Sequence, residues 1–283
     1  MFWDILRASA HLGAKISLAA IPYCLVYTQL RMFNFAFGEV ITFGGYVIYI
    51  LVEHLHWPLW SAVCAALLLS ALLGVVIERT AYRRLMTTPD RHLLLVSSIG
   101  VSIALQNFYQ AVFGSRTVYP TFSLDLGSCV WLVLTAELIA LLWVLGRTPF
   151  GSQVAAVASN RRLAQLLGIN PGFVYTTVFA IASALAVPPA LIEISENGIA
   201  PDTGFQLGLL AFAAAVLGGR ESLLQTAAAG FFLALLTQLA QVTGVLNERL
   251  VWVLCVIGAI LFSAGRRALR HYLKIRRGED SGE

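Results

Sequence analysis

Charged residues are scarce in this chain of 283 residues. Only 12% of the residues are Asp, Glu, Lys or Arg, whereas 58% are hydrophobic and the mean hydropathy is +0.78. A soluble globular domain carries about 25% charged residues, so this chain lacks the polar residues needed to cover a water-facing surface. The composition excludes most soluble classes and predicts a domain embedded in membrane lipid.

The residues that common catalytic sites require are also lacking. The two lysines, Lys15 and Lys274, do not follow the glycine of a P-loop, so ATP hydrolysis by that route is excluded. No HExxH or GxSxG motif occurs, and His54 and His56, the one close histidine pair, are typical of a membrane interface. The four cysteines lie far apart and without a CxxC pair. We therefore expect neither an enzyme nor a metal site.

The basic residues indicate membrane orientation rather than nucleic-acid binding. The net charge is +4, but Lys and Arg are interleaved with long apolar spans. Short cytoplasmic loops are enriched in these residues. Most of the 19 Lys and Arg fall in one set of alternate loops and in the C-terminal tail, whereas the opposite set contains only Arg116 and Arg249. The pattern predicts an N-terminus outside the cell, a cytoplasmic segment at 147–171 and a cytoplasmic basic tail at 266–283.

Apolar stretches predict an all-α, polytopic membrane protein that forms a single domain over residues 1–283. A transmembrane helix needs roughly 20 mostly apolar residues. Stretches of about this length are residues 12–30, 58–77, 93–113, 128–146, 172–192, 222–243 and 250–265. With two shorter stretches, 38–52 and 203–219, we expect about eight or nine transmembrane helices.

The two shorter stretches are interrupted by glycine and are predicted to line the pore. Their glycines are Gly38, Gly44 and Gly45 in the first and Gly204, Gly208, Gly218 and Gly219 in the second. Broken helices at membrane depth are tolerated only where protein or a water-filled cavity covers the freed backbone groups.

The segment 147–171 interrupts the hydrophobic pattern. Its apolar residues recur near helical spacing, Asn160 can cap a turn, and Gly168 followed by Asn170 and Pro171 ends a helix. We expect one short amphipathic helix on the cytoplasmic face. The pattern alone supports a helix lying at the lipid interface and a docking helix for a soluble partner equally.

Two acidic residues fall inside apolar stretches. Glu137 lies within 128–146, and Glu39 follows the residues Asn34 to Gly38. A carboxylate in a spanning helix costs a few kcal/mol on insertion scales, so it usually faces the protein interior or a cavity. No basic residue inside a span stands out as a partner for Glu137. These acids support one alternative function, an ion-coupled secondary transporter or channel that uses Glu137 or Glu39 as its proton or sodium site.

Four motifs occur in order between residues 27 and 230. They lie in YTQLRMFNFAFGEVITFGGY, in IERTAYRRLMTTPDRHLLLVSSIGVSIALQN, in the segment 147–171 and in LLAFAAAVLGGRESLLQTAAAG. Their matching positions are Tyr27, Arg31, Asn34, Phe35, Ala36, Gly38 and Glu39; Glu78, Arg79, Ala81, Tyr82, Arg83, Ile99, Gly100, Leu105, Gln106 and Asn107; Gly151, Ala156, Ala164, Gly168, Ile169 and Asn170; and Ala211, Phe212, Val216, Leu217, Gly218 and Gly219. Together they resemble the branched-chain amino acid permease family of bacterial ABC importers, in particular the smaller of its two permease types.

The resemblance implies a permease subunit of an ATP-driven importer in the bacterial inner membrane. Its expected partners are a second permease chain, two cytoplasmic ABC ATPase subunits and a periplasmic or lipid-anchored substrate-binding protein. No cofactor is expected in this chain, since ATP and Mg²⁺ would bind to the ATPase subunits. Branched-chain or related amino acids are the expected solutes, with urea or short amides as the alternative.

The resemblance also implies two groups of functional residues. We predict a substrate pathway along the two Gly-interrupted elements, formed by Asn34, Phe35, Gly38, Glu39, Gly218 and Gly219. Contact with the ATPase is assigned to the segment 147–171, through Gly151, Asn160, Ala164, Gly168, Ile169 and Asn170. With the resemblance, docking becomes the favoured interpretation of that segment.

Overall fold

The computed structural model describes residues 2–30, 34–87, 92–122, 128–218, 223–243 and 258. Within these residues the regular structure is helical, and the only β pairing is one isolated bridge. The α-helices are α1 (Phe2–Leu30), α2 (Ala36–Tyr49), α3 (Leu59–Ile77), α4 (His92–Phe113), α5 (Ser128–Gly146), α6 (Pro149–Ser159), α7 (Arg161–Leu166), α8 (Pro171–Ala184), α9 (Val187–Asn197), α10 (Thr203–Gly218) and α11 (Leu223–Thr243). Shorter turns are the π-helices η1 (Ile50–His54) and η2 (Glu78–Tyr82) and the 3-10 helix η3 (Leu85–Thr87). The predicted all-α fold is confirmed.

Six helical segments in the described part of the chain are long and apolar enough to cross a membrane. They are Leu6–Thr28, Ala36–His54, Leu59–Tyr82, His92–Phe113, Pro171–Asn197 and Leu223–Ala240. The number rises to seven if α5 and α6, which meet at an angle of 80°, count as one span. The predicted count of eight or nine is therefore not confirmed: α10 has only 16 residues, and the predicted span 250–265 lies outside the described residues except for Gly258. The predicted basic tail, 266–283, also lies outside them.

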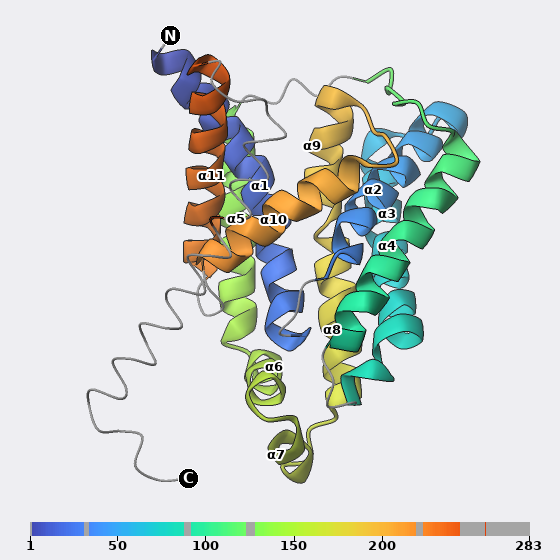
Figure 1. The fold of residues 1–283 in the computed structure, drawn as a ribbon, viewed down its shortest axis with the longest axis vertical. Coiled ribbons are helices and arrows are strands. Elements are labelled where there is room, and N and C mark those ends of the chain that lie inside the picture. The colour runs from blue at the N-terminus through green and yellow to red at the C-terminus, as the bar shows by residue number, and fades with distance from the viewer. Residues whose placement is uncertain are drawn as a thin grey trace.

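The spanning helices run roughly along the long axis of the molecule (Figure 1). Helix α1 packs along α11, α3 packs along α8, and α10 crosses α1 and α2 at a steep angle. The N-terminus lies at one end of the bundle, whereas α6 and α7 lie at the other (Figure 1). This placement agrees with the predicted orientation, which puts the N-terminus and the segment 147–171 on opposite sides of the membrane.

Burial divides the helices into a central and a peripheral group. Helices α1 and α2 are mostly buried, whereas α3, α4 and α11 expose much of their surface. The exposed positions include large apolar side chains such as Leu68 and Leu72 on α3 and Val96 and Ile103 on α4. Such surfaces are suited to lipid or to other membrane helices.

Connecting loops at the N-terminal end of the bundle are joined to one another. The backbone N–H of Val118 donates to the carbonyl of Ile199 at 2.9 Å, and the N–H of Ile199 donates back to Val118 at 2.9 Å. Nearby, the backbone N–H and the hydroxyl of Thr121 both donate to Oε1 of Glu53, at 2.6 and 2.8 Å. The loop after α4 is thereby fastened to the loop after α9 and to η1.

Candidate translocation and coupling sites

Asn34 lies between α1 and α2 and is held by two tyrosines. Its backbone N–H donates to the Tyr23 hydroxyl at 2.9 Å, and the Tyr82 hydroxyl donates to its Oδ1 at 2.7 Å. All three residues are buried. An amide in a membrane domain needs such partners, because an unsatisfied polar group in an apolar environment costs several kcal/mol. Asn34 was predicted from its motif, whereas Tyr23 carried no signal in the sequence beyond being aromatic.

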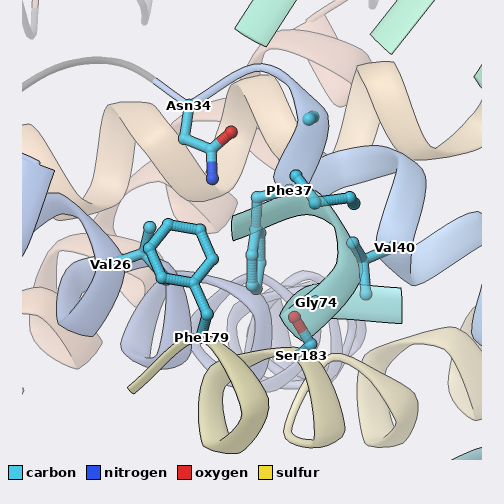
Figure 2. A pocket seen from close by; sticks show the side chains of 9 residues that line it. Val26, Asn34, Phe37, Val40, Gly74, Phe179 and Ser183 are labelled. Atoms are coloured by element: carbon cyan, nitrogen blue, oxygen red, sulfur yellow. The ribbon is translucent and has the colours of Figure 1, made fainter. Parts of the chain in front are cut away.

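Two cavities meet at Asn34. The first is a small cavity of about 10 Å³, roughly the room of one water molecule, and is bounded by α1, α2, α3 and α8. Its lining residues are Val26, Asn34, Ala36, Phe37, Val40, Gly74, Ile77, Phe179 and Ser183. Figure 2 shows the Asn34 side chain pointing into this cavity above the rings of Phe37 and Phe179.

The second cavity lies between α1, α2 and α10. Its volume is also about 10 Å³, and it is lined by Tyr23, Asn34, Phe35, Phe205, Gly208, Leu209 and Phe212. Both linings are largely apolar with few polar groups, but neither cavity is large enough in this conformation to hold an amino acid. A solute could occupy this place only after the surrounding helices move apart. Of the six predicted pathway residues, Asn34 and Phe35 line these cavities.

Gly38 instead allows α2 and α10 to pack closely. A Cβ atom at Gly38 would overlap the carbonyl oxygen of Gly204, and a Cβ at Gly204 would overlap that of Gly38. Gly208 also faces the Gly38 backbone. Small residues let two membrane helices approach in this way. Gly218 is similarly packed against the backbone of Thr226 at the start of α11, and Gly219 lies outside the described residues.

Glu39 is fully buried and faces α4 rather than the cavities. Its Oε1 accepts hydrogen bonds from Ser102 at 2.9 Å and from Gln106 at 2.8 Å. The Tyr109 hydroxyl donates to its backbone carbonyl at 2.9 Å. Glu137 differs, because its side chain is exposed on the surface of α5 in the isolated chain. The two acids proposed for ion coupling therefore lie in different environments.

A buried ion pair joins α1 to α9. Lys15 Nζ lies 2.7 Å from Oε2 of Glu193 and 3.4 Å from Oε2 of Glu196, and His11 Nε2 lies 2.9 Å from Oε1 of Glu196. The Lys15 side chain is 8% exposed. From the sequence, Lys15 was interpreted only as an orientation signal, and this cluster was not predicted. The available signal was a lysine within one apolar stretch and two glutamates just beyond the end of another.

A second ion pair lies at the α6–α7 end of the bundle. The Arg83 guanidinium binds both carboxylate oxygens of Glu78, at 3.0 and 2.9 Å, and Glu78 is fully buried. The same guanidinium also donates to the carbonyl of Gly172 at 3.1 Å and to the hydroxyl of Thr176, which donates to Glu78 at 3.1 Å. Bidentate pairs of arginine and a carboxylate are strong and directional. They fasten η2 to the first turns of α8.

The bend between α5 and α6 explains why a glycine occupies position 151. Thr148 caps α6 by accepting a hydrogen bond from the Gly151 N–H at 3.2 Å, and it donates to the carbonyl of Leu145 at 2.6 Å. A Cβ atom on Gly151 would contact the last carbonyl oxygens of α5. Pro149 occupies the first turn of α6, a position where its missing N–H costs nothing.

The segment 147–171 forms two helices, so the prediction of one helix was wrong. Asn160 ends α6 in an extended conformation and caps α7 by accepting from the Leu163 N–H at 3.1 Å. A side chain that caps a following helix offers the backbone an alternative to continuing the first helix. Asn170 caps α8 in the same manner, through the N–H groups of Gly172 and Phe173.

Gly168 ends the helical turn of α7 with φ +81°. The N–H of Ile169 donates to the carbonyl of Ala164 and the N–H of Gly168 to that of Gln165, both at 3.0 Å. This pair of bonds is the Schellman motif, which favours glycine at the left-handed position. Ala164 is buried, and Ile169 packs against the same apolar cluster. The predicted coupling residues Ala164, Gly168 and Ile169 thus fix the shape of one turn.

Three leucines are exposed around the end of α7. Leu163, Leu166 and Leu167 are 54%, 84% and 70% exposed, and α7 is the outermost helix at its end of the bundle (Figure 1). Exposed apolar patches on a protein commonly mark an interaction surface.

The fold and these sites define a multi-pass α-helical membrane protein with internal cavities and a projecting helical segment, which is the organisation of a transport subunit. A protein family described as "Branched-chain amino acid transport system / permease component" matches residues 5–265. The chain belongs to this family. Its relatives are permease subunits rather than enzymes.

Individual relatives agree with this membership. The high-affinity branched-chain amino acid transport system permease protein LivH of Salmonella typhimurium is 33% identical, over 75% of this chain and 77% of LivH. BraD of Pseudomonas aeruginosa, which carries the same description, is 31% identical over the same shares. The autoinducer 2 import system permease protein LsrD of Klebsiella pneumoniae is 27% identical, over 82% of this chain and 74% of LsrD.

A solved structure supports the fold. One chain of PsaBC from Streptococcus pneumoniae in complex with Fab aligns with 93% of this chain and 95% of its own length, with a TM-score of 0.52. The sequence identity is 13%, so this likeness concerns the fold alone.

Proposed function

We propose that this chain is a permease subunit of an ATP-driven importer for branched-chain amino acids in the bacterial inner membrane. The projecting α7 with its exposed leucines is the observation that supports coupling to a soluble motor. In this proposal the apolar surface of Leu163, Leu166 and Leu167 binds an ABC ATPase subunit on the cytoplasmic side. ATP and Mg²⁺ bind to that subunit, which supplies the differential binding energy that moves the packed helices.

The proposed assembly contains three further kinds of component. A second permease chain completes the membrane pathway, a second ATPase subunit pairs with the first, and a periplasmic or lipid-anchored binding protein delivers the solute. The names of LivH and BraD support branched-chain amino acids as the solute. In this conformation the small cavities at Asn34 cannot hold leucine, but their aromatic and aliphatic walls are chemically compatible with a branched side chain once the helices separate.

Uptake should require ATP and an active ATPase subunit. In proteoliposomes that contain the assembled transporter, we expect leucine uptake with ATP, no uptake when the ATPase carries an inactivating substitution, and continued uptake when proton and sodium gradients are collapsed. Isoleucine and valine should compete with leucine, and urea should not. Leucine uptake driven by an ion gradient without any ATPase subunit would contradict the proposal and favour a secondary transporter that uses Glu137 or Glu39.

Replacing Gly168 with valine should uncouple transport from the motor. The left-handed conformation at φ +81° disfavours a β-branched residue by on the order of 1 kcal/mol or more. An added Cβ atom meets nothing within 4 Å, so the effect comes from the backbone alone. We expect weaker ATPase binding and slower uptake at normal membrane levels of the permease.

A matched variant separates backbone conformation from side-chain size. Asparagine tolerates the left-handed conformation better than valine, so Gly168→Asn should retain most of the uptake that Gly168→Val loses. Equal, normal uptake by both variants would remove this turn from the coupling mechanism.

A further inference from the structure

We propose that the short segment from Glu78 to Met86 transmits movement of the docking helix α7 to Asn34 at the cavities. This inference rests on the proposed function, because it assumes that a motor subunit binds α7. It assigns positioning roles to Tyr82, Arg83 and Arg161. Three consecutive sets of contacts join α7 to the cavity through this segment, and each involves a buried or directional interaction.

The first set joins α7 to the segment. Arg161, the first residue of α7, donates from its guanidinium to the backbone carbonyl of Met86 at 2.9 Å. The same guanidinium lies 5.8 Å from the centre of the Tyr175 ring on α8. A displacement of α7 must therefore move the chain at Met86 or break this hydrogen bond.

The second set joins the segment to α8. Arg83 binds the buried carboxylate of Glu78 with two hydrogen bonds and also reaches Gly172 and Thr176 on the first turns of α8. Removing a buried carboxylate's partner is costly, so these groups are expected to move together. The start of α8 directly follows the Asn170 cap and the turn that ends α7.

The third set reaches the cavity. Tyr82 lies in the same π-helical turn as Glu78, and its buried hydroxyl donates to Oδ1 of Asn34 at 2.7 Å. Its ring centre lies 5.6 Å from that of Phe179, which lines the first cavity with Asn34. Single π-helical turns occur often at functional sites. Here the same turn carries Glu78, whose ion pair faces α8, and Tyr82, whose hydroxyl binds Asn34.

This arrangement supports a defined mechanical role. Binding of a motor at α7 can change the position of Asn34 only if the intervening groups have two arrangements. The contacts from Arg161 to Tyr82 supply a continuous set of linked groups, and in this proposal those groups shift together. The Asn34 amide would then point into the cavities in one nucleotide state and be displaced in the other.

The first test compares two tyrosine variants in the assembled transporter. Tyr82→Phe removes the hydroxyl that binds Asn34, and Tyr109→Phe removes another buried hydroxyl that bonds α2, at the carbonyl of Glu39. For Tyr82→Phe we expect ATP hydrolysis to continue while leucine transported per ATP falls about fivefold or more. Tyr109→Phe should leave this ratio at the wild-type value. If Tyr82 only stabilises the fold, Tyr82→Phe should lower the amount of assembled transporter without changing the leucine transported per ATP.

The second test addresses the ion pair. Arg83→Lys keeps the charge but loses the two-pronged geometry, and it should lower the same ratio. Arg79→Lys is the matched control, because Arg79 is exposed in the same turn. A normal ratio in both Tyr82→Phe and Arg83→Lys would overturn the proposal.

A labelling experiment measures how accessible the second cavity is to a water-soluble reagent. A cysteine at Phe35, which lines the second cavity, is introduced into a transport-competent background without the four native cysteines. We expect a water-soluble thiol reagent to react at a rate that ATP changes, and we expect Tyr82→Phe to abolish this change. Persistence of the ATP effect in Tyr82→Phe would refute the route, whereas uptake without ATP in the wild-type assembly would refute the proposed function itself.

Discussion

Lys15→Met is expected to reduce the free energy of unfolding by about 3 kcal/mol, because it leaves the largely buried Glu193 carboxylate, 13% exposed, without its cation. The methionine side chain retains most of the length and apolar contact of the lysine. Glu193, at 2.7 Å from Nζ, would lose its cation, whereas the more exposed Glu196 would keep its contact with His11. The loss is measurable as a lower midpoint of thermal denaturation and a smaller monodisperse fraction in detergent.

Two further variants identify the cause of that loss. Adding Glu193→Gln to Lys15→Met removes the uncompensated charge and should restore part of the stability. Arg7→Met deletes an exposed cation from the same helix and should have little effect. If Lys15→Met were as stable as Arg7→Met, the ion pair would not contribute to the fold.

Gly38→Val is expected to reduce transport to near background. Its side chain would overlap the backbone of Gly204, and neither helix backbone can move aside as a flexible side chain would. Overpacking of this kind costs about 1–3 kcal/mol and occasionally more. Helix α10, which carries Phe205 and Gly208 on the wall of the second cavity, would be displaced from α2.

Gly100→Val is the matched control for this change. Gly100 lies on α4, its added Cβ would meet nothing within 4 Å, and the substitution makes the same change in helix propensity. We expect normal membrane levels and transport for this variant. Transport by Gly38→Val at the level of Gly100→Val would show that the close α2–α10 contact is dispensable.

The sequence predicted individual helices well where hydrophobicity alone decides them. The predicted stretch 128–146 coincides with α5, and 58–77 and 93–113 differ from α3 and α4 by one residue at their start. A long apolar run must form a helix in lipid because its backbone groups have no other partners. The number of crossings was less predictable, because α10 is short and α6 turns away from α5.

Contacts between distant residues were not predictable from hydrophobicity. Lys15 and Glu193 are 178 positions apart, and Tyr82 and Asn34 are 48 apart. The glycines of α2 and α10 were visible in the sequence, but their spacing does not distinguish a broken pore helix from a close helix crossing. At Gly38 and Gly204 the structure has a close helix crossing, and the predicted pore role of these elements stays a prediction.

The fastened loops at the N-terminal end of the bundle have a consequence for association. Val118 is paired with Ile199 and Thr121 with Glu53, so residues 118–121, the loop after α9 and η1 are already joined to one another in the isolated chain. A protein that binds this end would lose little conformational entropy in ordering them, which favours binding without added contacts. For such a partner, association would not have to wait for these residues to rearrange.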